Sequence, residues 1–236
     1  MTATLPPSGT DTPPAPTSRD GLGALVAVHA ALLAGGAVAL SLDAPAQGWG
    51  VLVCVVAYVA ALLAVCRAAG RDDLLALAGF LAVVSVFQLL PDWVLADLVG
   101  TLRFPDTGGP RVDDVIPLAM VAMWVAPLFV AVALAGGRPG RAALLSALVF
   151  LGAEVLAPTL GLWEPVGDTH RLLGVAVYVV PAEAALGWAA ATAFALVRHR
   201  PLPARVGAAL AVSTFYLGAL VLAHFVVDVA GWRITA

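Results

Sequence analysis

Three acidic residues lie inside long runs of the chain that are otherwise uncharged, where ionisable side chains are rare. Glu154 is the thirteenth residue of the run 142–162, Glu183 is the twelfth of 172–197, and Asp228 lies towards the end of 206–230. Placing an acid in hydrocarbon costs roughly 2.5–3.5 kcal/mol on insertion scales, so an acid at this depth indicates function unless a partner explains it. The two glutamates are expected near the middle of a membrane.

Each glutamate has a proline close by in the sequence. Pro158, four residues after Glu154, lacks the N–H that would bond the Glu154 carbonyl. Pro181 leaves the carbonyl of Val177 free in the same way and is expected to bend the helix near Glu183. A free acceptor and a carboxyl group are therefore expected to share one place on each helix.

Two further polar sets recur at helical spacing. His224 and Asp228 are four residues apart, and Ser85, Gln88 and Asp92 follow one another at intervals of three and four. Residues at these intervals lie on one face of a helix. Together with the glutamates they predict one polar pocket that opens outward in the outer half of a helical bundle.

A carboxyl group among apolar side chains favours its neutral form and can donate a proton at neutral pH. Acid-initiated chemistry on an alkene requires such a donor, and a lipid-embedded pocket excludes the water that would quench a carbocation. An aromatic face can stabilise the positive charge. We therefore interpret Glu183, Glu154, Asp228, His224 and Asp92 as candidate catalytic residues, and Tyr178, Trp163, Gln88 and Trp93 as candidate contacts to a hydrophobic or lipid substrate. No cofactor and no metal are expected, since the known motifs for diphosphate, zinc or phosphate binding are missing from the sequence.

Each of these residues also has a structural interpretation. A buried Glu can be protonated and hydrogen-bonded to a neighbouring helix as a packing device. His224 with Asp228 can be plain polarity at a helix end, His29 a packing histidine, and Trp163 an anchor at the membrane interface. A proton-coupled transporter would use the same acids as a relay, and a non-catalytic membrane assembly protein stays open as well. Against a transporter, the sequence shows no internal repeat of the transporter kind.

A pair of short motifs resembles a known family. Gly161-Leu162-Trp163, with Pro181-Ala182-Glu183 following 18 residues after the tryptophan, is similar to the G-[IL]-W and P-x-E-E signature of the heterodimeric-type lycopene cyclases, which are small membrane-bound carotenoid cyclases. Ala184 stands where that family has its second glutamate. The resemblance implies that Glu183 protonates the end of a polyene without net redox change, in the manner of polytopic isoprenoid cyclases and isomerases.

These residues must be positioned by membrane-spanning helices. The 236 residues are 61% hydrophobic and 11% charged, with a mean hydropathy of +0.98, which excludes a soluble fold. A net charge of −3 excludes a nucleic-acid surface. About 20 helical residues cross a hydrocarbon core of ~30 Å, and seven uncharged runs reach nearly that length or more. They are 22–42, 49–66, 74–90, 115–135, 142–162, 172–197 and 206–230. The sequence therefore predicts an all-α polytopic bundle of about seven transmembrane helices.

The arginines predict the orientation of these helices. Eight fall on the side that holds the N-terminus, namely Arg19, Arg67, Arg71, Arg138, Arg141, Arg198, Arg200 and Arg205, and four on the other side, namely Arg103, Arg111, Arg171 and Arg233. Positive residues favour the cytoplasm. We therefore expect a protein of the cell membrane of a bacterium, with a cytoplasmic N-terminus and an external C-terminus.

The remaining segments complete the predicted organisation. Residues 1–20 hold five prolines and are expected to form a disordered tail, followed by one transmembrane domain over 21–236. Within it, 91–114 is expected to form an outer interfacial helix followed by a structured loop. Cys54 and Cys66 are too far apart on one helix to form a disulfide.

Overall fold

The computed structural model describes residues 18–230. It contains the helices α1 (Ser18–Leu40), α2 (Ala46–Ala68), α3 (Asp72–Phe87), α4 (Leu89–Trp93), α5 (Met120–Met123), α6 (Val125–Ala135), α7 (Pro139–Leu156), α8 (Val179–Val197) and α9 (Leu202–His224), and the π-helical turns η1 (Val94–Val99) and η2 (Phe225–Val229). The expected disordered tail falls almost entirely on residues 1–17, outside the described part of the chain.

The predicted all-α membrane bundle is confirmed. Within residues 18–230, six helices are long and apolar enough to cross a membrane, namely Gly21–Leu40, Ala46–Ala68, Asp72–Val99, Pro139–Leu156, Val179–Val197 and Leu202–Val229. A shorter apolar helix, Met120–Ala135, supplies the seventh element of the bundle. Cys54 and Cys66 are free thiols, as expected.

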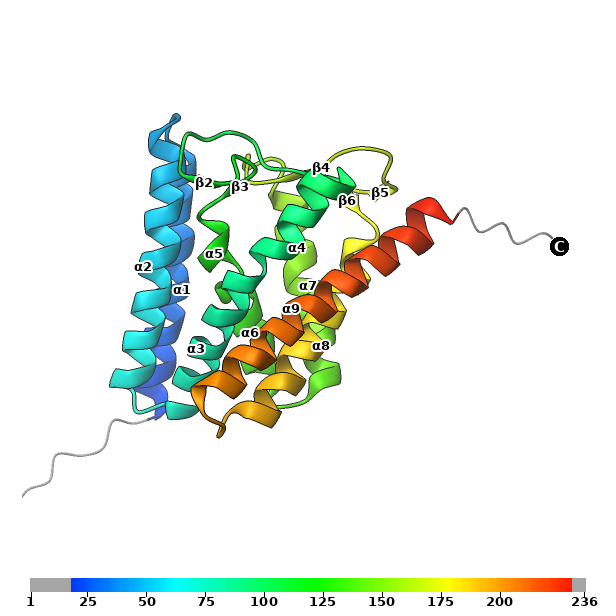
Figure 1. The fold of residues 1–236 in the computed structure, drawn as a ribbon. Coiled ribbons are helices and arrows are strands. Elements are labelled where there is room, and N and C mark those ends of the chain that lie inside the picture. The colour runs from blue at the N-terminus through cyan, green and yellow to red at the C-terminus, as the bar shows by residue number, and fades with distance from the viewer. Residues whose placement is uncertain (1–17, 231–236) are drawn as a thin grey trace, which may run out of the picture.

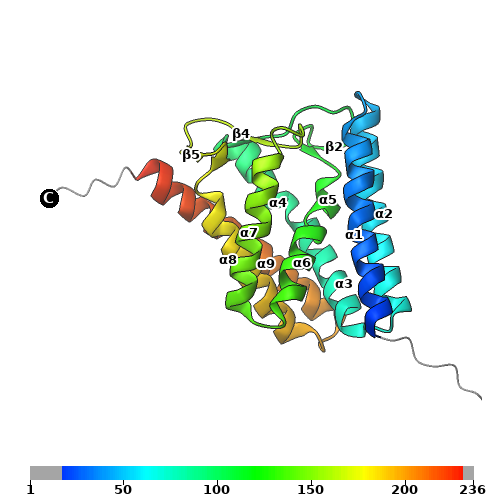
Figure 2. The same ribbon diagram turned by 180° about the vertical axis from the view of Figure 1, so that it is seen from behind.

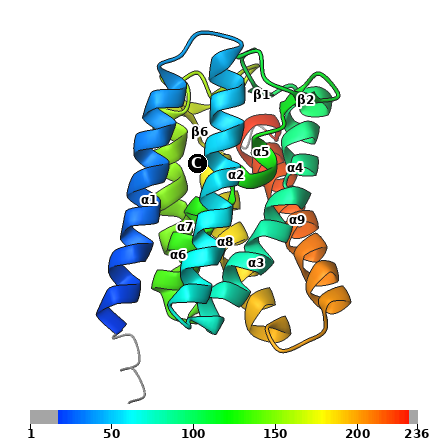
Figure 3. The same cartoon turned by 90° about the vertical axis from the view of Figure 1, so that its left-hand side faces the viewer.

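The helices form a layered arrangement that is visible from two sides (Figures 1 and 2). α1 and α2 pack as an antiparallel hairpin, and α2 packs on α3. On the other side, α7 packs on α8 and α8 on α9, while α3 contacts both α6 and α9. The α1–α2 hairpin thus stands at one flank of the bundle (Figure 3).

Two long loops, residues 100–119 and 157–178, lie at the same end of the bundle, which we call the loop end (Figure 1). Their strands β1 (Leu102–Arg103) and β4 (Glu164–Pro165) pair in antiparallel fashion. The Arg103 guanidinium donates to Oε1 of Glu164 at 2.6 and 2.8 Å across this pair. The two loops therefore form one connected cover.

Each loop also carries a small hairpin. β2 (Arg111–Val112) pairs with β3 (Ile116–Pro117), and β5 (Arg171–Leu172) pairs with β6 (Val175–Ala176). Both arginines fold back on the loop that precedes them: the Arg111 guanidinium donates to the carbonyls of Phe104 and Pro105, and that of Arg171 to the carbonyl of Gly167.

These hairpins correct the expected limits of two spans. The runs 115–135 and 172–197 begin in β-structure, and their helices start only at Met120 and at Val179. Hydrophobic run length did not reveal this, because apolar hairpins that pack under a cover look like the ends of apolar helices.

Prolines explain three helix boundaries. Pro91 removes the backbone bond to the Phe87 carbonyl where α3 gives way to α4, and Pro127 removes the one to Met123 where α5 gives way to α6. The Ser213 hydroxyl donates to the Phe87 carbonyl at 2.8 Å, so α9 satisfies the acceptor that Pro91 frees. Pro158 follows the end of α7 by two residues.

Pro181 acts differently from expectation. It lies in the first turn of α8, where backbone N–H groups have no partner within the helix, and Val177 lies outside the helix. It therefore starts α8 and does not bend a helix near Glu183. Glu183 therefore lies near the start of α8. Glu154 lies near the end of α7, so both glutamates are towards the loop end and not at mid-span.

The expected interfacial helix at the start of 91–114 is not a separate element. Residues 91–99 continue α3 through α4 and η1, so that one helical span runs from Asp72 to Val99. The following loop docks on the start of α2. There the Gly48 N–H donates to the Thr107 carbonyl, and a side chain at Gly48 would come within 2.3 Å of the Gly109 nitrogen.

The order of elements repeats within the chain. The span ending at Val99 is followed by a strand, a hairpin and the helix pair α5–α6, and α7 is followed by a strand, a hairpin and α8. Asp92 and Glu154 each precede the first residue of the next strand, Leu102 or Glu164, by ten positions. The corresponding strands β1 and β4 pair with each other in antiparallel fashion. The structure therefore repeats an order of elements that the sequence did not indicate.

Candidate functional site

A cavity of about 290 Å³ lies beneath the two loops. Its wall combines hydrocarbon with polar and aromatic side chains drawn from both repeats and from α9. The polar and aromatic members are Asp92, Thr101, Phe104, Trp124, Phe150, Glu154, Trp163, Tyr178 and Tyr216. Leu102 and Pro165, from the paired strands β1 and β4, line it as well, so the connected loops cover this space.

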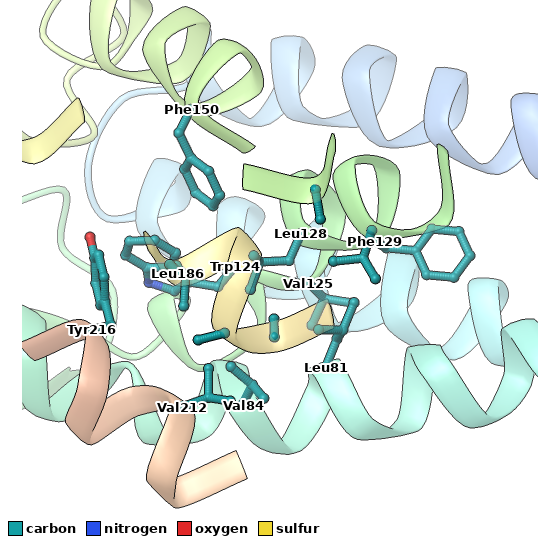
Figure 4. Close-up of a cluster of buried hydrophobic side chains, with 14 of the residues drawn as sticks. Leu81, Val84, Trp124, Val125, Leu128, Phe129, Phe150, Leu186, Val212 and Tyr216 are labelled. Atoms are coloured by element: carbon teal, nitrogen blue, oxygen red, sulfur yellow. The ribbon is translucent and has the colours of Figure 1, made fainter. Parts of the chain in front are cut away.

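Asp92 is held by an indole. The Trp124 Nε1–H donates to Oδ2 of Asp92 at 3.1 Å, and the aspartate is only 3% exposed. Trp124 is fixed in turn by Phe150, with ring centroids 5.1 Å apart, and by Tyr216 at 5.7 Å in an edge-on arrangement. Figure 4 shows the Trp124 ring between these two aromatic side chains. The break between α5 and α6 falls at Trp124, so Pro127 helps to define where the indole lies.

Glu154 has a similar partner. The Trp163 Nε1–H donates to Oε1 of Glu154 at 2.9 Å. Glu154 lies in the last turn of α7 and Trp163 in the loop that follows, so the end of α7 brings the two together. The cavity therefore contains two carboxyl groups, each oriented by an indole N–H.

Asp92, Glu154 and Glu183 have no cationic partner among the described residues. The acid–base pairs in residues 18–230 involve other carboxyl groups, with Arg71, Arg103, His170 and His224 as the basic partners. Asp92 and Glu154 line the same cavity, and Glu183 is buried behind its wall. Three acids thus share a low-dielectric region without compensation by arginine, which is costly unless protons neutralise them.

Tyr178 joins the two loops at the cavity wall. Its hydroxyl lies 2.8 Å from the Thr101 hydroxyl, and both side chains are buried. The ring of His224 packs edge-on against that of Tyr178 at 5.1 Å. Tyr178 therefore presents its ring to the cavity while its polar end is occupied.

Glu183 lies behind the cavity wall. It is 1% exposed, it is not among the lining residues, and its Oε2 has no hydrogen-bond partner within the described chain. Gln88 is also fully buried and outside the lining, and neither atom of its amide finds a partner in residues 18–230. Glu183 and Gln88, both predicted as site residues, are therefore buried polar groups that do not line the cavity.

His224 and Asp228 form a separate network at the end of α9. His224 Nδ1 lies 2.9 Å from Oδ2 of Asp228, and the backbone N–H and Nδ1 of His170 lie 2.7 and 2.8 Å from Oδ1. This network ties the second loop to the C-terminal helix. Trp93 also lies outside the cavity, where its indole N–H donates to Asp113 at 3.1 Å.

The structure thus brings Asp92, Glu154, Trp163 and Tyr178 together and leaves Glu183, Gln88, His224, Asp228 and Trp93 outside the cavity lining. The single outward-opening pocket expected for all of them is not what the described residues form. No three His, Cys, Asp or Glu side chains in residues 18–230 gather closely enough to bind a metal ion.

Five polar or aromatic lining residues were not predicted as site residues from the sequence, namely Thr101, Phe104, Trp124, Phe150 and Tyr216. Trp124 has the residue type to orient an acid, and Pro127 three residues later signals an irregular helix. Thr101 and Tyr216 carry no such signal, since their place depends on how distant segments pack.

The fold and the site define a polytopic α-helical membrane protein with a buried cavity that contains two carboxyl–indole pairs. The chain belongs to a family described as a domain of unknown function, DUF6989, whose model matches residues 89–227. The match begins at the first residue of α4 and ends in η2, so it includes both structural repeats from Asp92 onwards but not α1 and α2. No curated protein and no solved structure matches the chain.

Proposed function

We propose that this protein is a cofactor-independent membrane enzyme that uses Asp92 and Glu154 for acid-initiated cyclisation, isomerisation or hydration of an isoprenoid or another unsaturated lipid. One observation carries the proposal: two carboxyl groups, each bonded to an indole N–H, line one aromatic cavity inside a membrane bundle. The partial resemblance to carotenoid cyclases is consistent with this class of chemistry.

The indole bonds determine how such an acid would react. In a neutral carboxyl group the carbonyl oxygen accepts the indole N–H, which leaves the hydroxyl on the other oxygen free to donate. Trp163 would hold Glu154 in this way, and Trp124 would hold Asp92. The tryptophans are thus positioning residues, and the carboxyl groups are the candidate catalytic residues.

Proton transfer by two acids balances without a co-reactant. The O–H bond of the neutral acid breaks as a C–H bond forms on the alkene, leaving a carbocation on the substrate and a carboxylate on the protein. After rearrangement or ring closure, a neighbouring C–H bond gives its proton to the carboxylate that the first step left, directly or by relay through the second neutral acid. The electrons of that C–H bond form a new double bond, so both acids end neutral. In a hydration, water adds to the cation and then loses a proton to the carboxylate.

The aromatic wall suits the cationic intermediate. Trp124, Tyr178 and Tyr216 line the same cavity, and aromatic faces attract positive charge. The low-dielectric surroundings exclude water, which protects a carbocation from quenching. Glu183 is expected to act on the site only electrostatically, because it lies outside the lining.

The proposed orientation places the loop end outside the cell. Arg67, Arg71, Arg138, Arg198 and Arg200 lie at or next to the ends of helices opposite the loop end. By the positive-inside rule, that end lies on the cytoplasmic side of a bacterial cell membrane. A single cysteine replacing Thr107, in a chain with Cys54 and Cys66 changed to alanine, should react with an impermeant maleimide on intact cells, whereas one replacing Arg138 should react only after lysis.

Production of a new lipid tests the enzyme. Cells expressing the protein and fed linear polyprenyl precursors should accumulate a product isomeric with the precursor, or heavier by one water, as seen by mass spectrometry. Changing Asp92 to Asn together with Glu154 to Gln should abolish the product at equal protein abundance. An unchanged product in the double variant would refute the proposal.

A proton-coupled transporter is the second candidate, and the internal repeat favours it. Parallel repeats related by an axis along the membrane normal occur in transporters, with the substrate site between the repeats. Asp92 and Glu154 hold equivalent places in the two repeats here. Uptake of a solute into proteoliposomes, driven by an imposed pH gradient and lost in the same double variant, would support transport over catalysis.

A further inference from the structure

A second cavity, also of about 290 Å³, adjoins the site. It lies between the α1–α2 hairpin and the α5–α6 pair, on the flank of the bundle where Figure 2 shows α1 beside α6. The two cavities share a boundary made of Leu32, Leu33, Met123, Ala126 and Leu162. The two cavities therefore adjoin along these side chains, and the second extends from the acid cavity towards α1 and α2. We call the second cavity the side groove.

The side groove offers hydrocarbon to an occupant. Its lining contains no charged side chain, and its two weakly polar members are already occupied. The Tyr58 hydroxyl bonds His29 Nε2 at 3.1 Å, and the Cys54 thiol lies 3.7 Å from the Leu32 carbonyl. The acid cavity beside it has carboxyl, hydroxyl and indole groups, so of the two adjoining cavities one is apolar and the other holds the groups that could react.

The rim of the groove faces the membrane. Leu33, on the membrane-spanning helix α1, is 74% exposed. Leu160, in the loop that follows α7, is 40% exposed. On a membrane-spanning helix an exposed leucine contacts lipid, so the side groove borders the hydrocarbon core. On the loop side the cavity is covered by the paired strands β1 and β4. The apolar flank is therefore the route open to a molecule dissolved in the bilayer.

We propose that the side groove binds the hydrocarbon chain of a long, linear isoprenoid substrate, which enters sideways from the bilayer and presents its terminal double bond to Asp92 and Glu154. This inference rests on the proposed function and specifies its substrate class. It assigns the chain-binding part of the site to α1 and α2, which lie outside the segment matched by the family model. Chain length is then selected by the groove and reactivity by the acids.

Gly36 provides a sharp test of the groove. It lines the groove, and a Cβ added there would meet nothing within 4 Å, so a large side chain can be introduced without a clash at its base. Gly36→Phe should fill the groove. Gly23 lies on the same helix, also has nothing within 4 Å of an added Cβ, and lines neither cavity. Gly23→Phe is therefore the matched control for helix propensity and expression.

The measurement is equilibrium binding of radiolabelled geranylgeraniol and of the shorter geraniol to the full chain in phosphatidylcholine nanodiscs, with empty nanodiscs subtracted. Geranylgeraniol should bind the wild type more tightly, because each additional methylene or methyl group buried in the groove adds to affinity. Gly36→Phe should weaken geranylgeraniol by about tenfold or more. Geraniol binding should be unchanged in this variant, and Gly23→Phe should leave both probes unaffected.

Two results would overturn the inference: geranylgeraniol binding that is unaffected by Gly36→Phe, or binding that falls equally in Gly36→Phe and Gly23→Phe. The proposed function fails by a different result. If geranylgeraniol binds in a Gly36-dependent way but wild-type protein converts no polyprenyl substrate, the groove stands and the chemistry does not.

Discussion

Trp163 donates its indole N–H to Oε1 of Glu154 at 2.9 Å, across the turn with which α7 ends. Nine residues separate the two in the chain, and the loop between them holds Pro158 and the left-handed Gly161. The helix end is thus built so that an aromatic donor reaches back to an acid. The same pairing recurs at Asp92 with a donor from a different helix, Trp124.

Changing Glu154 to Gln should reduce turnover by roughly a hundredfold or more, because a general acid contributes about that much or more to the rate of a protonation step. The amide accepts the Trp163 N–H equally well, so the fold should be retained. Glu164→Gln is the matched control, since Glu164 is a surface partner of Arg103 outside the cavity lining. Equal turnover in the two variants would remove Glu154 from the chemistry.

Changing Trp163 to Phe should reduce turnover less than Glu154→Gln does, by about tenfold, because the acid stays and only its orienting bond of about 1–2 kcal/mol is lost. The test is a comparison of kcat and KM in membranes. A positioning role predicts a fall in kcat with KM nearly constant. Trp188→Phe, at a lipid-facing tryptophan that is 45% exposed, should change neither constant. A rise in KM alone would identify Trp163 as a substrate contact.

Removal of the Ser213 hydroxyl should lower the free energy of unfolding by about 0.6–2 kcal/mol, the range for a hydrogen bond between membrane helices. The reason is the Phe87 carbonyl, which Pro91 deprives of its helical donor and Ser213 satisfies. In a Pro91→Ala background the alanine N–H is available to that carbonyl, and Ser213→Ala should then cost less. Thermal unfolding in detergent measures both steps. Additive effects of the two substitutions would contradict this coupling.

Changing Asp228 to Asn should loosen the second loop, residues 157–178, without removing a side chain from the cavity lining. Asp228 accepts bonds from the backbone and side chain of His170 and from His224, whereas its own side chain does not line the cavity. Backbone hydrogen exchange of residues 166–172 should accelerate. Residues 102–107, which are held by the pairing of β1 with β4 and by the bonds from Arg111, should exchange as in the wild type. Equal acceleration in both segments would show that the network stabilises the whole loop end.

The spans were predictable because hydrophobic run length depends on local composition alone. Their boundaries were less so: the helix that follows the first hairpin starts at Met120, and run length cannot separate an apolar hairpin from a helix end. The internal repeat was hidden for a related reason. It is carried by the order of elements and by strand pairing, and no repeated sequence motif accompanies it.

The acids of the site were predictable, but their partners were not. Glu154 stands out because carboxyl groups are rare in apolar runs, and Asp92 because it follows Ser85 and Gln88 at helical spacing. Trp124, Thr101 and Tyr216 become part of the site only through contacts between segments far apart in the sequence, such as the 77 residues that separate Thr101 from Tyr178. Glu183 shows the converse, since a motif drew attention to a side chain that packing then places behind the wall.

The repeated order of elements makes the connection between the two copies dispensable in principle. α6 ends at Ala135 and α7 begins at Pro139, and the left-handed glycines Gly136 and Gly137 lie between them. A gene cut at this point would encode two shorter chains, each with one of the two cavity acids Asp92 and Glu154, one strand of the β1–β4 pair and one hairpin. The strands β1 and β4 pair across the cut. Co-expression of the two chains should therefore rebuild the same interior from separate polypeptides.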